Sequence, residues 1–207
     1  MGRRPTDQHA PGFAGLVWPV RTRRTTLRPV TPADRDAVHT FRSREDVTTY
    51  LGRGPMTPED VDERIAENLA RAQPGHEHPL LGLVIELDDA VVGDCMVRFE
   101  PDDNGMRIAF IGYTLHPDVA GRGLATEVAR ALVRLCFTEL GVAMVQADVF
   151  VPNIASQRVL EKAGLRRIGM TPAGSEGEGH PRMDDLLYAV TAAEWAASPH
   201  PGGRDEP

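Results

Sequence analysis

Residues 107–136 place an apolar strand, a glycine turn and an amphipathic helix one directly after another. The turn contains Gly121 and Gly123, and the helix begins near Leu124. Glycine has no Cβ and takes positive φ readily, so the backbone of such a turn can aim several N–H groups at one point. The N-terminus of the helix adds its partial positive charge at the same point. The stretch therefore predicts a strand-to-helix crossover that carries a cradle for an anionic ligand.

Alternating and continuous apolar runs predict about seven strands around this crossover. They lie at 25–30, 79–87, 90–99, 106–115, 142–150, 165–170 and 183–190. Short links between the second, third and fourth strands favour antiparallel neighbours, whereas the helix at 123–140 makes the fourth and fifth strands parallel. We expect a mixed, mostly antiparallel sheet flanked by helices, an α/β (α+β) fold.

Helix-start signals and composition predict the remaining organisation. Two threonine caps followed by proline open helices at 31–34 and 57–60, and Asn153 caps a short helix over 154–163. Pro, Gly and charged residues dominate both ends of the chain. We expect a disordered arm at 1–24, one domain at 25–195 and a disordered tail at 196–207.

Composition excludes several function classes. The formal net charge of −7 disfavours a nucleic-acid surface, which needs a basic face. No apolar run approaches the roughly 20 residues that span a bilayer, so we expect no membrane partner and a cytoplasmic location. Cys95 and Cys136 lie far apart without a metal-binding spacing, so we expect two buried free thiols and no metal site.

Two other phosphate-binding motifs do not match the glycine turn. A dinucleotide fold would put its glycines after an early strand, and here they follow four strands. A Walker loop requires Gly-Lys followed by Ser or Thr, which occurs nowhere in the chain. Basic residues that could assist the turn are Arg122, Arg130, Arg134, Arg158 and Lys162, although a solvated helix face explains Arg130 and Arg134 better.

Two motifs carry a resemblance to a known family. They are "IGYTLHPDVAGRGLATEVARALV" at 111–133 and "NIASQRVLEKAGLRRIG" at 153–169. Together with the ending "DDLLYAVTAAEW" they resemble the GNAT superfamily of N-acetyltransferases, in particular its RimJ/RimL branch, over about residues 25–190. The second motif is the more discriminating one. The resemblance implies a GNAT-like fold whose sheet is splayed between the fourth and fifth strands, and acetyl-CoA as the acetyl donor in that opening.

The resemblance also assigns roles to residues. The pantetheine arm is expected along the fourth strand near Thr114 and Leu115. The pyrophosphate is expected on the backbone donors of Gly121, Arg122, Gly123, Leu124 and Ala125, with the hydroxyl of Thr126 added. Asn153 is expected near the cofactor arm, and Ser156 is placed to protonate the departing thiolate.

Simpler explanations exist for several of these residues. Asn153 is a natural helix cap whatever the function, and serine is common in a first helical turn such as that of Ser156. Tyr113 is better explained as core than as pocket wall, and His116 as a turn residue. The family's turn often begins with Gln or Arg where this chain has Asp118, so we expect that carboxylate to face solvent.

The general base is left open by the sequence. Glu86, Asp94, Glu100 and Asp148 lie on strands that could line an acceptor cleft, but each is more often a solvated strand residue. Near pH 7 an α-amine is ~10–15% neutral and a lysine only ~0.04% neutral. A site without an evident strong base therefore favours an α-amine acceptor.

The main hypothesis is an acetyl-CoA-dependent N-acetyltransferase that transfers acetyl by direct attack in a ternary complex, with a protein or peptide N-terminus as the favoured acceptor. One alternative is an acetyltransferase for a small amine such as an antibiotic or polyamine. Another is a non-catalytic acyl-CoA sensor. The resemblance leaves a homodimer open, because superfamily members often dimerise.

Overall fold

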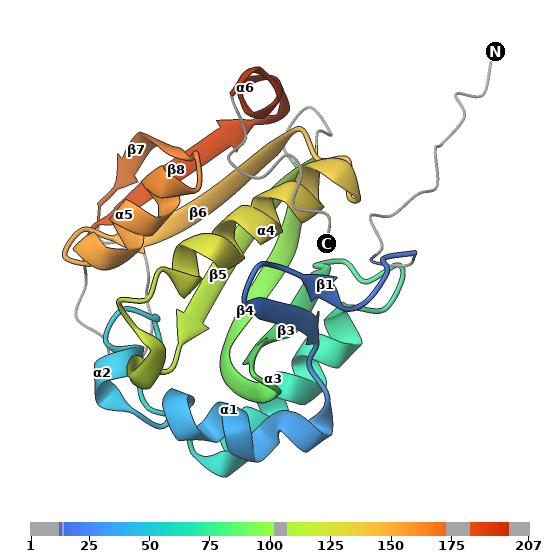
Figure 1. Cartoon of the computed structure of the whole chain (residues 1–207), viewed down its shortest axis with the longest axis vertical. Coiled ribbons are helices and arrows are strands. Elements are labelled where there is room, and N and C mark those ends of the chain that lie inside the picture. The colour runs from blue at the N-terminus through green and yellow to red at the C-terminus, as the bar shows by residue number, and fades with distance from the viewer. Residues whose placement is uncertain (1–12, 14, 102–106, 173–182, 199–207) are drawn as a thin grey trace.

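The computed structural model describes residue 13 and residues 15–101, 107–172 and 183–198. The strands are β1 (Val20–Arg21), β2 (Thr25–Pro29), β3 (Leu80–Leu87), β4 (Ala90–Pro101), β5 (Arg107–Leu115), β6 (Met144–Phe150), β7 (Arg166–Thr171) and β8 (Asp185–Thr191). The α-helices are α1 (Arg35–Arg42), α2 (Glu45–Thr48), α3 (Pro58–Arg71), α4 (Leu124–Thr138), α5 (Ile154–Lys162) and α6 (Ala192–Ala197), and short 3-10 turns occupy Pro32–Asp34 and Pro117–Val119 (Figure 1).

These strands form one mixed sheet in the order β1-β2-β3-β4-β5-β6-β8-β7. Every neighbouring pair is antiparallel except β5 and β6, which are parallel and joined through α4. The expected mostly antiparallel sheet with flanking helices is confirmed. Over the described residues it has eight strands where about seven were predicted, because the two-residue strand β1 carries too short a pattern to be recognised.

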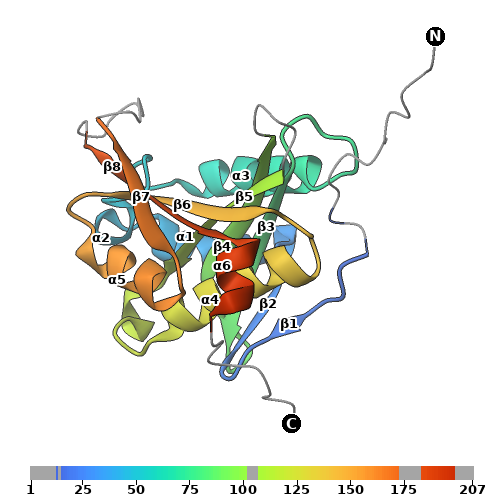
Figure 2. The ribbon, with the colours of Figure 1, turned by 90° about the horizontal axis from the view of Figure 1, so that it is seen from above.

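Helices cover both faces of the sheet. Figure 2 shows α3 on one face and α4 on the other. Buried apolar residues of α4 pack with those of the central strands in the main core, while α1 and α3 pack in a second cluster around Val84 of β3. The sheet therefore separates an α4 side from an α3 side, and a functional opening between strands would connect them.

Described residues before Thr25 pack on the domain, in the segment predicted to be a disordered N-terminal arm. Phe13 is buried and stacks on Phe99 of β4 with ring centroids 5.1 Å apart. Val20 and Arg21 pair with Leu27 and Thr26 of β2. The prediction of an arm rests on its proline and charge content. That composition gives no indication of a single core aromatic, Phe13, or of the two-residue edge strand β1. Residues 1–12 lie outside the described residues.

Local signals placed most helix starts correctly. Thr57 accepts a hydrogen bond from the backbone N–H of Asp60 at 3.2 Å, and the Asp60 carboxylate accepts from the Thr57 N–H at 2.7 Å, which caps α3. Thr191 and Glu194 cap α6 in the same way. At 31–34 the chain forms a 3-10 turn before α1 begins. Within the described residues, no helix is both long and apolar enough to cross a membrane.

Candidate active site

The pairing of β5 with β6 stops halfway along both strands. Their register runs only from Ile108–Met144 to Phe110–Gln146, so the ends of the two strands diverge. A pocket of about 410 Å³ occupies this opening. The splay implied between the fourth and fifth predicted strands is therefore present, and the predicted strands correspond to β5 and β6.

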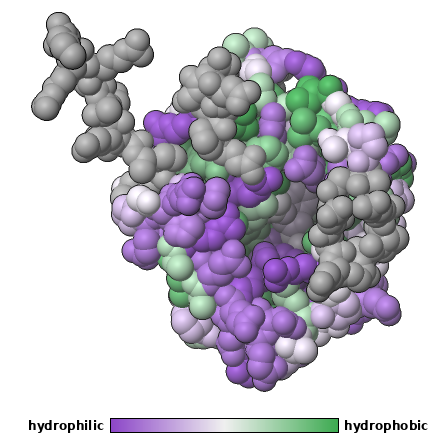
Figure 3. All heavy atoms as spheres, turned by 180° about the vertical axis from the view of Figure 1, so that it is seen from behind, coloured by the Kyte–Doolittle hydropathy of each residue, from purple (hydrophilic) through white to green (hydrophobic). Residues whose placement is uncertain are grey.

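The pocket passes from one face of the sheet to the other. Ser156 and Leu160 line it from α5, on the α4 side, whereas Arg42 and Arg64 line it from α1 and α3. Seen from behind in Figure 3, the face opposite α4 is hollowed near its centre, and the surface around the hollow is largely hydrophilic. The opening is thus accessible to ligands from both faces of the sheet.

The glycine turn lies on the α4 side, where α4 begins. Gly121 and Gly123 have φ of +72° and +78°, and Gly123 directly precedes the helix. The structure shows no side-chain cap at this helix start. The first N–H groups of a helix have no partner within the helix, so those of Leu124, Ala125 and Thr126 are available to an anion. Arg122 is exposed, and its carbonyl accepts from Arg24 Nη1 at 2.9 Å.

Glu127 is an anchor of this turn that the sequence reasoning missed. Its carboxylate accepts hydrogen bonds from the Thr22 hydroxyl, from the Arg24 backbone N–H at 2.7 Å and from Arg24 Nε at 2.9 Å. Burial raises the pKa of Glu127, but these hydrogen bonds outweigh burial, so the pKa is lowered overall. Its partners lie about 100 residues away in the region predicted to be an arm, so no local pattern could reveal them.

The end of β5 presents its backbone to the opening. Thr114 is buried, and a Cβ added to Gly93 of β4 would lie 2.2 Å from the Thr114 carbonyl oxygen, so β4 and β5 are in close contact there. The Leu115 side chain packs with Leu87 and Leu124. Because β6 has diverged, the β6-facing edge of this segment offers backbone donors and acceptors to a ligand.

Three polar residues meet where the strands separate. The Tyr113 hydroxyl and Ser156 Oγ share a hydrogen bond of 2.9 Å, and Asn153 Oδ1 accepts from the Ser156 N–H at 3.1 Å. Asn153 thus caps α5, as its simpler explanation predicts, and also lines the pocket. Tyr113 was expected to be core. Its ring does pack against the core, but its hydroxyl faces the pocket, and burial raises its pKa to about 12.

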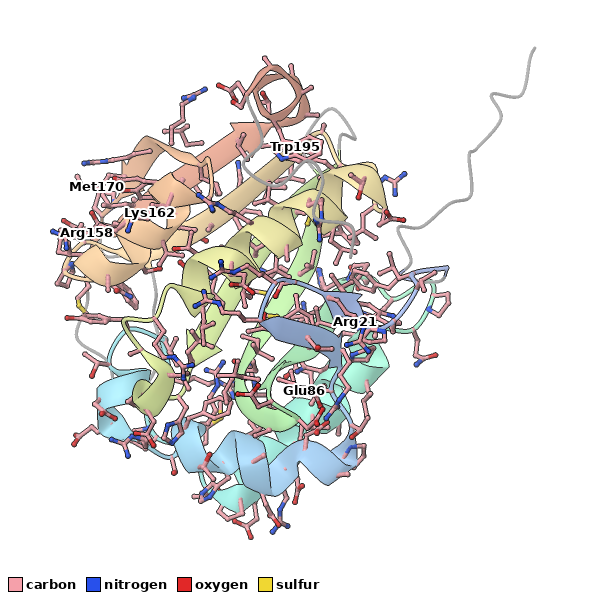
Figure 4. The ribbon with its side chains drawn as sticks, in the orientation of Figure 1. Arg21, Glu86, Arg158, Lys162, Met170 and Trp195 are labelled. Carbon is pink, nitrogen blue, oxygen red and sulfur yellow. The ribbon has the colours of Figure 1, made fainter. Side chains whose placement is uncertain are left out.

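The candidate bases differ sharply in their surroundings. Glu86 pairs with Arg28 Nε at 2.8 Å, and Figure 4 shows it far from Arg158 and Lys162 on α5. Asp94 lines the pocket, but its carboxylate is held by Arg42. The Glu100 side chain lies outside the described residues.

Asp148 is the remaining candidate whose side chain is described, and it too lines the pocket. Burial raises the pKa of this carboxyl, although Arg98 Nη2 lies 3.9 Å away and opposes the shift. A carboxylate with a raised pKa at the end of an opening strand is better suited to accept a proton than one clamped by a guanidinium.

Further residues behave as their chemistry suggests. The Asp118 side chain is 84% exposed, so it faces solvent as expected, and His116 Nδ1 accepts from the Asp118 N–H at 3.2 Å. Arg130 donates to the Lys162 carbonyl, at 2.8 Å through Nη2, and so joins α4 to α5. Arg158 and Lys162 are exposed on α5.

The two cysteines are free and buried. Burial raises the pKa of Cys136 to about 12 and that of Cys95 well above its ordinary value, which disfavours a thiolate nucleophile. Over the described part of the chain, no three His, Cys, Asp or Glu side chains gather as a metal site would need.

Comparisons with known proteins agree with this geometry. A family model described as an acetyltransferase (GNAT) domain matches residues 24–166. The uncharacterized N-acetyltransferase YnaD of Bacillus subtilis is 26% identical over 180 residues, covering 85% of this chain and 98% of YnaD. The solved structure of Mycobacterium smegmatis RimJ in complex with CoA-disulfide has a TM-score of 0.75 at 27% identity, covering 87% of this chain and 88% of RimJ.

More distant solved structures share the fold alone. They include RimL, a ribosomal L7/L12 alpha-N-protein acetyltransferase in complex with coenzyme A, with a TM-score of 0.73 at 18% identity over 84% of this chain and 97% of RimL. A Vibrio cholerae spermidine N-acetyltransferase in complex with CoA and spermine has a TM-score of 0.68 at 17% identity over 84% of this chain and 98% of its own. Because the family model matches most of the chain, and because the opening and the glycine turn are where such a domain needs them, the chain belongs to the GNAT family and is an acetyl-CoA-dependent N-acetyltransferase.

Proposed function

We propose that the chain acetylates the N-terminal α-amine of a peptide or protein by direct attack of the neutral amine on the thioester. The observation that carries the proposal is the Tyr113–Ser156 hydroxyl pair in a pocket that opens to both faces of the sheet. Acetyl-CoA would enter from the α4 side and the amine from the α3 side. Acetyl-CoA supplies the activated acetyl group, and the chain supplies position, hydrogen bonds and proton transfer.

Binding of the donor would rest on backbone groups. The turn Gly121–Gly123 and the first N–H groups of α4 would hold the pyrophosphate, where exposed donors meet the positive end of the helix. Thr126 would add its hydroxyl. The free edge of β5 at Thr114 and Leu115 would bind the pantetheine amides and polarise the thioester carbonyl.

Departure of the thiolate would depend on Ser156. Breaking the C–S bond leaves a sulfur anion, which would take the Ser156 hydroxyl proton while the Tyr113 hydroxyl donates a hydrogen bond to Ser156 Oγ. The proton that the attacking amine releases would then return to Ser156 Oγ through water, so that the hydroxyl is restored. Tyr113 is suited to this because a phenol with a pKa of about 12 keeps its proton at neutral pH. Asn153 would hold the Ser156 backbone in place through its cap.

Removal of the amine proton would fall to Asp148, directly or through water. Among the three strand carboxylates whose side chains the structure describes, its surroundings favour it most. The other two strand carboxylates with described side chains are held by arginines, Glu86 by Arg28 and Asp94 by Arg42. An α-amine needs less help than a lysine, because a larger fraction of it is already neutral near pH 7.

A small polyamine acceptor has one observation in its favour. Asp148 and Asp185 both line the pocket and would attract a cation. The relatives of the same fold include both kinds of enzyme, since the names of RimL and of the V. cholerae protein specify a protein N-terminus and spermidine.

Thiol release from acetyl-CoA with a panel of amines tests the proposal. The panel contains peptides with free α-amines, lysine peptides with blocked N-termini, spermidine and an aminoglycoside. We expect the highest kcat/KM with a free α-amine. A clear preference for spermidine or the aminoglycoside would replace the proposed acceptor. Acetyl-CoA binding in calorimetry without turnover on any amine would favour the non-catalytic sensor.

A further inference from the structure

The acceptor side of the pocket carries its charges in two separate groups. Arg42 and Arg64 approach from α1 and α3 and surround Asp94 of β4. Asp148 of β6 and Asp185 of β8 form the second group, in which Arg98 of β4 lies beside Asp148. The pocket thus has a basic side and an acidic side, and such a separation favours a ligand that carries both charges.

The basic side holds more positive charge than its carboxylate neutralises. Arg42 Nε donates to Asp94 Oδ2 at 2.9 Å and Nη2 contacts Oδ1, so these two side chains, about one-tenth exposed, compensate each other. Arg64 Nη2 lies 3.9 Å from the same carboxylate. Burial lowers the pKa of Arg64, and the charges of Arg42 and Arg53 lower it further, although Asp94 and Glu67 oppose this. An anionic group beside Arg64 would relieve this repulsion.

The acidic side has the opposite imbalance. Asp185 pairs in register with Phe150, two residues beyond Asp148, so both carboxylates belong to the same face of the sheet. Burial raises the pKa of both groups, and the charge of Asp148 raises that of Asp185 further. Arg98, which lies over the Phe110 ring at 4.0 Å, partly compensates Asp148. An ammonium group beside this pair would be stabilised.

We propose that the preferred acceptor bears a carboxylate a few bonds from its primary amine, and that Arg64 binds this carboxylate and determines the preference. The amine would lie toward Asp148 and Asp185, where β6 leads to the acetyl group. A polycation such as spermidine or an aminoglycoside would bring a second ammonium group against Arg42 and Arg64. The inference rests on the proposed function and deepens it by naming the charge of the acceptor.

Matched acceptors separate the sources of such a carboxylate. One series is a set of amidated peptides with a free serine N-terminus and Glu, Gln or Lys at the second position. The other is glutamate against its diamide. We expect kcat/KM to be about tenfold higher for the carboxylate-bearing member of at least one series, as one charge-assisted contact to the partly exposed Arg64 would give. The series that shows the preference identifies whether the carboxylate is that of a peptide side chain or of a free amino acid.

Variants of Arg64 assign the preference to its side chain. Arg64→Gln should abolish the preference while leaving acetyl-CoA affinity unchanged, and Arg64→Lys should restore most of it. Arg35→Gln is the matched control, because Arg35 lies on neighbouring α1, contacts Asp62 of α3 at 3.3 Å and is outside the pocket lining. This control should retain the full preference. Unchanged acetyl-CoA binding shows that each variant is folded.

The outcomes also separate the two proposals. Turnover that is equal across each series, that is higher with the Lys peptide than with the Glu peptide, or that keeps its preference in Arg64→Gln would overturn the role of Arg64 alone. Turnover that is highest with spermidine would overturn both the role of Arg64 and the proposed α-amine acceptor, and would leave the N-acetyltransferase assignment intact. Absence of thiol release with every amine, while acetyl-CoA still binds, would overturn the proposed function and this inference with it.

Discussion

The two sides of the pocket are built in different ways. On the α4 side, the candidate donor contacts are mostly backbone groups of consecutive residues, from Gly121 to Thr126 and along the end of β5. On the α3 side, the candidate acceptor contacts are charged side chains from five separate elements, including Arg64 of α3 and Asp185 of β8. Backbone groups do not depend on side-chain identity. Substitutions on the acceptor side can therefore change which amine binds without changing the contacts to the donor.

The largest effect on function is expected at the glycine turn. Gly123→Val should weaken acetyl-CoA binding by at least about 100-fold, because a branched side chain at φ +78° is strained by roughly 1–3 kcal/mol and its Cβ would occupy the approach to the N–H groups. Calorimetry with acetyl-CoA measures this affinity.

Gly141→Val provides the matched control for Gly123→Val. Gly141 has φ +59° and open space around it, and it follows the opposite end of α4, about 22 Å away along a helix of this length. Gly141→Val should lose about as much stability as Gly123→Val and should keep the acetyl-CoA affinity of the wild-type chain. Equal affinities for both variants would contradict a donor side made of backbone.

The next largest effect on function is expected at Ser156 and Tyr113, where the two sides meet. Ser156→Ala should lower kcat about 100-fold, and Tyr113→Phe should lower it less, about tenfold, because general acid catalysis contributes roughly 10²–10⁴-fold. Acetyl-CoA affinity should be unchanged in both variants. Tyr188→Phe is the control, because its hydroxyl contacts Glu161 Oε1 at 3.3 Å outside the pocket. A larger loss of kcat for Tyr113→Phe than for Ser156→Ala would instead make Tyr113 the proton donor and Ser156 its hydrogen-bonding partner.

The contrast between the two sides also explains which parts of the site could be predicted from the sequence. The glycine turn, the cap at Asn153 and the strand order around α4 are local patterns, and the residues that carry them are contiguous. The Glu127–Arg24 anchor and the Arg42–Asp94 pair join residues 103 and 52 positions apart, so only the folded chain brings them together. Tyr113 shows the intermediate case, because strand alternation identifies a buried ring but not the direction of its hydroxyl.

The largest loss of stability is expected for a substitution on the acceptor side. Asp94→Asn leaves Arg42 and Arg64 without a carboxylate, and breaking a buried ion pair in this way typically costs about 3–5 kcal/mol. Chemical denaturation should show this loss. The exposed pair of Arg44 and Asp46 offers the control, since Asp46→Asn should change stability by no more than about 1 kcal/mol. A similar small loss for both variants would mean that the buried cluster is not a structural unit.

A smaller loss of stability is expected at Glu127, whose contacts with Arg24 join the start of α4 to the N-terminal segment. Glu127→Gln keeps the shape of the side chain and removes its charge, so a loss of about 1–3 kcal/mol at pH 7 is expected from weakened charge-assisted hydrogen bonds. The folded-state pKa of Glu127 is lowered, so its stabilisation is fully present above the unfolded-state value and is lost as pH falls through the folded-state value.

The pH dependence tests the cause of that loss. The free-energy difference between the wild-type chain and Glu127→Gln should therefore be largest near neutral pH and should narrow below about pH 4, close to the ordinary glutamate value. Denaturant titrations at stepped pH values measure it. A difference that stays constant with pH would show that Glu127 stabilises α4 by packing. A difference that narrows would show that one carboxylate, held by the N-terminal segment, fixes the turn whose backbone is proposed to bind the donor.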